Sequence, residues 1–167
     1  RQRAMAGEIS NDGGVPAHLE QARDAVAAKV AVLEVFDPKD LAGLTTFNGT
    51  TYRMLSADGR QTTYDAQNRQ KLPGVLATDA DDDWITTGTS SPGQRALVDA
   101  QFYARVTDNF YLSSKGFNWK THYPQGMVSS AHLGRRYNNA YWNGTQMAYG
   151  DGDGASFIEF SGDLDVV

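Results

Sequence analysis

One stretch of the chain has the periodicity of a long helix, and this stretch constrains the fold more than any other feature. Ser90, Ser91 and Pro92 precede it, and these residue types favour the first turn of a helix. From Gln94 to Ser113 apolar side chains then recur at helical spacing: Ala96, Val98, Phe102, Tyr103, Val106, Phe110 and Tyr111. The spacing predicts a helix over 94–113.

The sequence around this helix is typical of short strands joined by tight turns. Residues 45–69 are rich in Thr and Tyr and contain Asn48-Gly49 and Asp58-Gly59, which are turn-forming dipeptides. The segments TTYRML and RQTTYDA flank Asp58-Gly59, so a β-hairpin is predicted there. In the last third of the chain, Gly and Asn recur every few residues with aromatic residues between them, which indicates further short strands.

The first 45 residues divide into two parts. Residues 1–14 are polar and interrupted by Gly, so we expect a flexible leader or tether. From Pro16, apolar residues at spacings of three and four predict a shorter N-terminal helix. Residues 30–36 fit either a strand or a continuation of that helix. We therefore treat 15–45 as a helix-strand segment and 46–167 as the main domain.

Composition excludes several classes of protein. A chain of 167 residues is long enough for one globular core, and no apolar run approaches the roughly 18 residues that cross a bilayer. The net charge is −5 and no basic stripe is visible, so nucleic acid is not an expected partner. The chain has no Cys, which excludes disulfides, a thiolate nucleophile and Cys-bound zinc.

The acidic clusters are the strongest local sign of a metal site. Asp79, Asp81 and Asp83 alternate in one segment and could offer several oxygen ligands to Ca²⁺, although a solvated acidic turn is the simpler interpretation. Asp151-Gly152-Asp153-Gly154 is interpreted as a turn, because its spacing does not complete a calcium loop. The three His residues form no His-Glu-x-x-His motif, and His132 is expected to be a packed, hydrogen-bonded residue.

Three motifs near the carboxyl end carry a specific resemblance. They are YNNAYWNG at 137–144, QMAYGDGDG at 146–154 and SGDLDVV at 161–167. In this order they resemble the thermolysin family of zinc metalloendopeptidases. TTYDAQNRQKLPGVLATDAD and DAQFYARVTDNFY are similar to that family too, so the resemblance covers roughly residues 50–167. The segment FNWKTHYPQG at 117–126 departs from the family pattern, which has Asp-Gly where Thr121-His122 stand.

The resemblance implies an α+β fold: the β-rich amino-terminal lobe of a thermolysin-like enzyme, with one long helix at about 93–114. In that family the zinc-binding His-Glu-x-x-His helix follows directly after the Asp-Val-Val motif. The resemblance therefore places no catalytic residue in this chain, and we expect 46–167 to be a lobe truncated before the zinc-binding helix and inactive alone. Zinc would then be a cofactor of the full-length enzyme, and calcium a possible further ligand.

The resemblance also assigns site residues. Asn139 would hydrogen-bond the substrate main chain, Ala140 and Trp142 would align a peptide as an added strand, and Tyr141 would face the pocket. Tyr141 and Trp142 could equally be ordinary packing residues. Asp165 would be part of an incomplete calcium site, and Asp79 and Asp81 fall where some members bind another calcium.

Two functions follow as alternatives. The first is the substrate-edge lobe of a secreted, extracellular zinc metalloendopeptidase that hydrolyses internal peptide bonds. Its partners would be a peptide or protein substrate and the missing carboxy-terminal half of the enzyme. The second is a non-catalytic extracellular module that uses the same lobe for binding or inhibition.

Overall fold

The computed structural model describes residues 40–84 and 94–162, and these form two sheets and one long helix. The strands are β1 (Thr46–Phe47), β2 (Tyr52–Arg53), β3 (Gln61–Arg69), β4 (Val75–Leu76), β5 (Thr78–Asp79), β6 (Met127–Leu133), β7 (Ala140–Trp142) and β8 (Met147–Tyr149). The helices are α2 (Gln94–Lys115), the short α3 (Trp119–His122) and the 3-10 turn η1 (Phe160–Gly162). The predicted leader at 1–14, the predicted helix from Pro16 and the ambiguous 30–36 segment lie outside the described residues.

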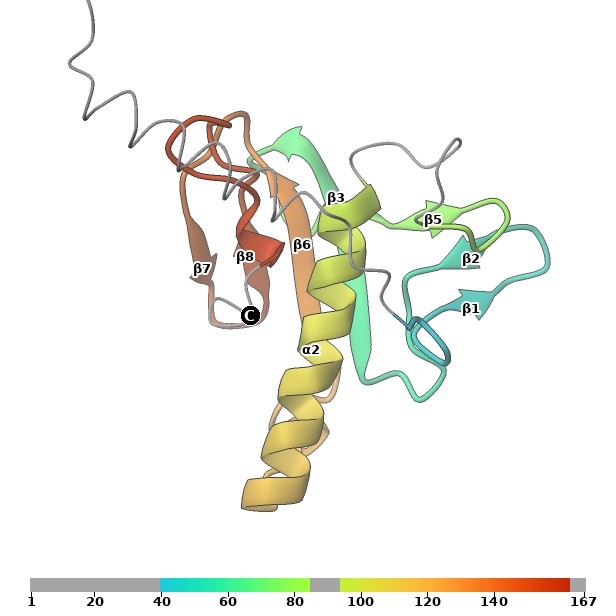
Figure 1. The fold of residues 1–167 in the computed structure, drawn as a ribbon. Helices are drawn as coiled ribbons and strands as arrows, with labels where there is room; N and C mark the ends of the chain where they lie inside the picture. Colours follow the sequence, from blue (N-terminus) through green and yellow to red (C-terminus); the bar gives the residue numbers. More distant parts are fainter. Residues whose placement is uncertain (1–39, 85–93, 163–167) are drawn as a thin grey trace, which may run out of the picture. The chain divides into compact units, whose positions relative to one another are not determined.

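The larger sheet is mixed and has β7 at one edge. Its strand order is β4-β3-β6-β8-β7, in which β3, β6 and β8 run parallel while β4 and β7 are antiparallel to their neighbours (Figure 1). The smaller sheet has the order β1-β2-β5 and is antiparallel throughout. Parallel neighbours need long connections, and α2 lies within the connection between β3 and β6.

Helix α2 packs along one face of the larger sheet, against β3 and β6 (Figure 1). Its small side chains Ala96, Ala100 and Ala104 are buried, which lets the helix approach the strands closely. The predicted helix at 94–113 is confirmed, with two further residues at its carboxyl end. Phe110 and Tyr111 share the predicted spacing but are about half exposed, because the last turns of α2 extend past the buried part of the sheet.

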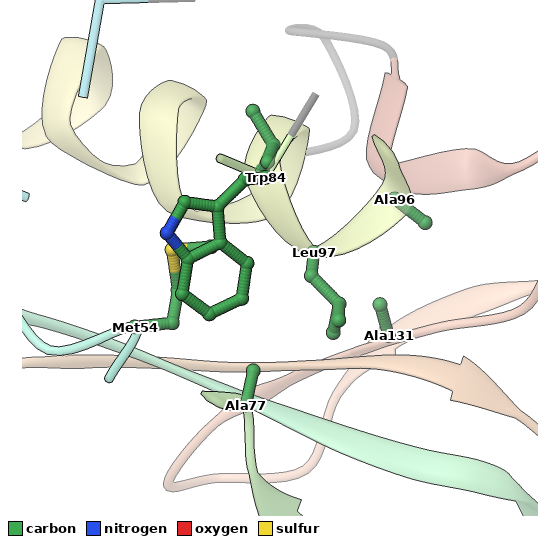
Figure 2. Packing of buried hydrophobic residues seen from close by; sticks show 7 residues of the cluster. Met54, Ala77, Trp84, Ala96, Leu97 and Ala131 are labelled. Carbon is green, nitrogen blue, oxygen red and sulfur yellow. The ribbon is translucent and has the colours of Figure 1, made fainter. Parts of the chain in front are cut away.

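The main hydrophobic cluster lies between α2 and the strands and is centred on Trp84. Figure 2 shows its indole ring beside Met54, and the same cluster includes Leu97 of α2 and the alanines Ala77, Ala96 and Ala131. Trp84 is only 1 % exposed, and its ring nitrogen donates to Asp82 Oδ1 at 2.8 Å, so the polar end of the indole also has a partner. Burying this ring stabilises the fold and fixes the acidic segment 79–83 beside the core.

The predicted hairpin around Asp58-Gly59 is confirmed close to its turn, where the Ser56 N–H donates to the Gln61 oxygen and the Thr63 N–H to the Met54 oxygen. Gly59 has a φ of 65°, and an antiparallel bridge joins Leu55 to Thr62. Farther from the turn the two segments separate, because β2 pairs with β5 in the smaller sheet and β3 pairs with β6 in the larger one. The turn depends on the residues within it, whereas the pairing of the strands depends on residues far away in the sequence.

A buried carboxylate joins α2 to the start of β3. Asp108 is 1 % exposed and accepts hydrogen bonds from Arg60 Nε at 2.6 Å, from Arg60 Nη2 at 2.5 Å and from Gln61 Nε2 at 2.8 Å. Hydrogen bonds with Asp108 raise the pKa of the Arg60 guanidinium above its ordinary value. The pair is bidentate and supported by a third donor, which is the geometry in which a buried ion pair is tolerated.

We expect Asp108→Ala to lower the free energy of unfolding by about 3–5 kcal/mol, because it leaves the Arg60 guanidinium without its charge partner in a mostly buried position. Urea denaturation followed by circular dichroism measures the loss. Asn109→Ala, at the exposed neighbouring position of the same helix, is the control. A loss no larger than that of the control would contradict the assigned role of Asp108.

Candidate functional site: the free edge of β7

Among the described residues, strand β7 has a partner strand on one side only. It pairs with β8 through Ala140↔Tyr149, Tyr141↔Ala148 and Trp142↔Met147, and it is the last strand of its sheet. The oxygen of Asn139 accepts from the Gly150 N–H at 3.0 Å, and the Asn143 N–H donates to the Gln146 oxygen at 3.1 Å. Since backbone groups alternate in direction along a strand, residues 139, 141 and 143 face β8. Ala140 and Trp142 therefore direct their backbone groups to the free edge.

The side chains of this edge are partly exposed. Tyr141 and Trp142 are 37 % and 38 % exposed, and the Asn139 side chain is exposed as well. Asn139 Oδ1 accepts from the Ala140 N–H at 2.9 Å, so the edge amide of Ala140 is already satisfied by its neighbour. The four consecutive residues that the resemblance singled out thus lie on the outer strand of the sheet, with their side chains at least partly exposed.

Trp142 also packs against the segment that departs from the family pattern. Its ring centroid lies 5.9 Å from that of Trp119 and 5.4 Å from that of Tyr123, both in edge-to-face geometry. Trp119 and Tyr123 stack on each other at 4.9 Å. Together with Tyr111 and Met147 these rings line a hollow of about 340 Å³ between the end of α2 and the sheet. Trp142 is therefore both a packing residue and an exposed one.

The turn at 150–157 holds the residues that lead into β7. The Gly150 N–H binds the Asn139 oxygen, and the Gly152 N–H donates to the Tyr137 oxygen at 3.2 Å. A Cβ atom on Gly150 would lie 2.0 Å from the Tyr137 oxygen, so only glycine permits this approach. The segment before β7 is placed by backbone contacts.

Two carboxylates of the same turn complete this support. Asp153 Oδ1 accepts from the backbone N–H groups of residues 155–157, and its Oδ2 accepts from Asn138 Nδ2 at 2.8 Å. The hydrogen bond from Asn138 and those from the backbone hold the pKa of Asp153 well below its ordinary value. Asp151 binds His132 Nδ1 at 2.8 Å. The interpretation of this segment as a turn, and of His132 as a packed, hydrogen-bonded residue, is confirmed.

The acidic segment 79–83 forms successive turns stabilised by its own side chains. Asp79 Oδ2 accepts from the Asp81 N–H at 3.1 Å, and Asp81 Oδ1 accepts from the Asp83 N–H at 3.1 Å. Burial disfavours the charged form of Asp79, but hydrogen bonds from the Asp81 backbone and from Gln94 lower its pKa overall. The segment lies at the surface, as expected, and its carboxylates are anchored as acceptors.

Metal ligands do not converge within the part of the chain that the structure describes. In residues 40–84 and 94–162 there is no group of three His, Asp or Glu side chains placed to hold an ion. The His122 ring stacks on Phe117 at 4.5 Å, and His132 is engaged by Asp151. These residues do not fit a zinc site, and Asp165 lies outside the described residues. No helix within these same ranges has the length and apolar character of a membrane span.

Comparisons with known proteins identify the family. The chain matches the thermolysin metallopeptidase family, in its catalytic domain, over residues 33–167. The chain belongs to this family. It is 40% identical to a bacillolysin of Bacillus cereus over 125 residues, which are 74% of this chain and 21% of the relative. It is 45% identical to the thermostable neutral protease NprT of Geobacillus stearothermophilus over 105 residues, which are 63% of this chain and 18% of that protein.

A solved structure agrees with this assignment. The precursor of protealysin, a metalloproteinase from Serratia proteamaculans, matches with a TM-score of 0.52 and 26% identity, over 91% of this chain and 42% of that one. The expected α+β, thermolysin-like fold is confirmed. The chain spans about a fifth of the length of the curated relatives that it matches.

The sequence alone did not single out the residues that contact β7 and the segment before it. Asp151 and Asp153 were interpreted only as turn residues, and Trp119 and Tyr123 lie in a segment whose role was open. The density of aromatic residues in 117–123 was the available signal, since exposed aromatic clusters beside an edge strand mark interaction surfaces.

We expect Asp153→Asn to reduce the stability of the fold at neutral pH, because an amide is a weaker acceptor for three backbone N–H groups. The carboxylate is held charged in the folded state, so its contribution is complete above the ordinary Asp pKa of about 3.9 and is lost as pH falls below it. Thermal unfolding of both proteins between pH 3 and pH 7 should show their melting temperatures converging at the acid end. A constant difference over this range would contradict the assignment.

Proposed function

We propose that this chain is the substrate-edge lobe of a secreted, zinc-dependent metalloendopeptidase that cleaves internal peptide bonds. Membership of the thermolysin family supports the reaction class. The sequence contains no His-Glu-x-x-His motif, so in this proposal the catalytic zinc is held by residues of the carboxy-terminal part of the enzyme, and the lobe alone is inactive. In this proposal it acts together with the carboxy-terminal part of the enzyme.

The observation that carries the proposal is the direction of the backbone groups on β7. The Ala140 oxygen and the backbone groups of Trp142 face the free edge, where an extended peptide can add as a further strand, while the Ala140 N–H is held by Asn139 Oδ1. The role proposed for Asn139 is to hydrogen-bond the peptide main chain beside them. Tyr141 alternates with these residues along the strand, and its exposed ring would contact a peptide side chain.

Complementation tests this function. We expect the chain alone to lack peptidase activity, and zinc-dependent cleavage of casein to appear when it is mixed with the carboxy-terminal part of the catalytic domain of the Bacillus cereus bacillolysin. Asn139→Ala should lower the recovered activity by about tenfold or more, because a hydrogen bond in a closed site contributes on the order of 1–2 kcal/mol.

The control is Asn109→Ala, which removes an amide from the exposed face of α2 and should leave the recovered activity unchanged. Cleavage by the chain alone would contradict the proposed inactivity. Failure of the two parts to complement, with retained peptide binding by the chain, would favour the non-catalytic binding module instead.

We also propose that the acidic segment binds calcium weakly through Asp79, Asp81 and Asp83. Asp79 and Asp81 accept backbone hydrogen bonds, and the pKa of Asp79 is lowered, so it stays charged. In the described structure the three side chains do not converge on one point, so in this proposal the ion draws them together as it binds. An ion bound only by the folded state would stabilise it by mass action.

The expected result is a rise of a few degrees in melting temperature in millimolar Ca²⁺, with no equal rise in Mg²⁺, because Mg²⁺ sheds its water less readily. The double substitution Asp79→Asn with Asp81→Asn should abolish this gain. A calcium response of the same size in the double variant would place the ion elsewhere.

A further inference from the structure

Four basic residues meet at the end of the larger sheet where β3 and β6 stop. They are Arg69, Lys71, Arg135 and Arg136, named here the basic corner, and all four are exposed. Arg69 is opposite Leu133 in the parallel ladder, and its oxygen accepts from the Gly134 N–H at 3.2 Å. The two segments that carry the corner are therefore direct neighbours, at the end of the sheet where the chain leaves β6 for β7 (Figure 1).

The side chains of the basic corner differ from other arginines of this acidic chain in their ion pairing. Arg60, Arg95 and Arg105 are paired with Asp108, Glu159 and Asp58, respectively. Within residues 40–84 and 94–162, by contrast, no side chain of the basic corner takes part in an ion pair. Four like charges on adjacent segments repel one another, so an anionic partner would be favourable there.

Carboxylates on the neighbouring segments already have partners. Asp65 accepts from the Gln67 backbone, Asp151 binds His132, and Asp153 binds Asn138 and the backbone of its own turn. They reduce the local potential, but they are held by these contacts. The charge of the corner remains available to a partner from outside.

The position of the corner relates it to the free edge of β7. From Arg136 the chain passes through only three residues before β7 begins at Ala140, and this connection is held in place by Gly150 and Gly152. An extended peptide advances about 3.3 Å per residue. A peptide paired with β7 would therefore reach the corner about two to four residues beyond the position opposite Ala140.

We propose that the basic corner selects peptide substrates with acidic side chains at that distance from the residue paired with Ala140. The inference rests on the proposed function, since it requires a peptide along β7, and it adds a charge preference to it. Arg135 and Arg136 are the nearest members in sequence and carry most of the effect. Arg69 and Lys71 add to the field behind them.

Binding of labelled peptides to the purified chain, followed by fluorescence anisotropy, tests the preference. The peptides share one neutral extended core and differ only in a flank of two Glu, two Gln or two Lys residues. We expect the Glu peptide to bind about fivefold more tightly than the Gln peptide at low salt, and the difference to shrink at 0.5 M salt. A further peptide carries the Glu flank and N-methyl groups on alternate core amides, so that these amides cannot donate hydrogen bonds. Its binding reports whether the core pairs with the free edge of β7.

Arg135→Gln with Arg136→Gln should remove the advantage of the Glu flank, whereas Arg135→Lys with Arg136→Lys should retain most of it. Arg135→Gln and Arg136→Gln are also made singly, and each should reduce the advantage. Lys115→Gln, at the far end of α2, removes one positive charge elsewhere and should leave the advantage intact. Circular dichroism checks that each variant is folded.

Equal binding of the Glu and Gln peptides would overturn the charge preference and leave strand addition at β7 standing. Unchanged binding after N-methylation would show a general anion site and would overturn the assignment to substrate. Failure of all the peptides to bind would overturn both the preference and the peptide-binding role of the edge.

Discussion

The contact on which the rest of the described structure depends is the buried pairing of Asp108 with Arg60. It fixes helix α2 over the start of β3, and so sets the position of the helix on the sheet. Arg60 Nη1 also donates to Asn118 Oδ1 at 3.1 Å, and that oxygen accepts from the Lys120 N–H at the start of α3. The next residue after Asn118 is Trp119, which packs on Trp142 of β7. A continuous set of contacts thus leads from the core to the edge.

The sequence predicted the elements whose signals are local. The helix at 94–115 follows from its 3.6-residue spacing, and the turn at Asp58-Gly59 follows from residues that accept a positive φ. The division of β2 and β3 between two sheets could not be read in the same way. It depends on the parallel pairing of β3 with β6, some sixty residues away, and Thr-rich strands fit either partner equally well.

The residues of the candidate site also differ in whether the sequence alone could predict them. Motif resemblance was enough to name Asn139, Ala140, Tyr141 and Trp142. The structure places this segment at the outer strand of the sheet, and the roles of the four residues are proposals. The bonds of Asp153 to Asn138 and of Asp151 to His132 join residues 15 and 19 positions apart, and no spacing rule predicts them. His132 adopts a φ of 57° at the end of a strand, which local propensity would not indicate.

The close approach of Gly150 to the Tyr137 oxygen has a consequence for how such a lobe can diversify. Main-chain contacts and the hydrogen bond from Asn138 to Asp153 set the path into β7, and none of these contacts involves the side chain of Arg135, Arg136 or Tyr141. Substitutions at Arg135, Arg136 or Tyr141 can then accumulate without disturbing the core, whereas Gly150 tolerates none. New recognition properties are accessible by single mutations on a backbone that stays constant.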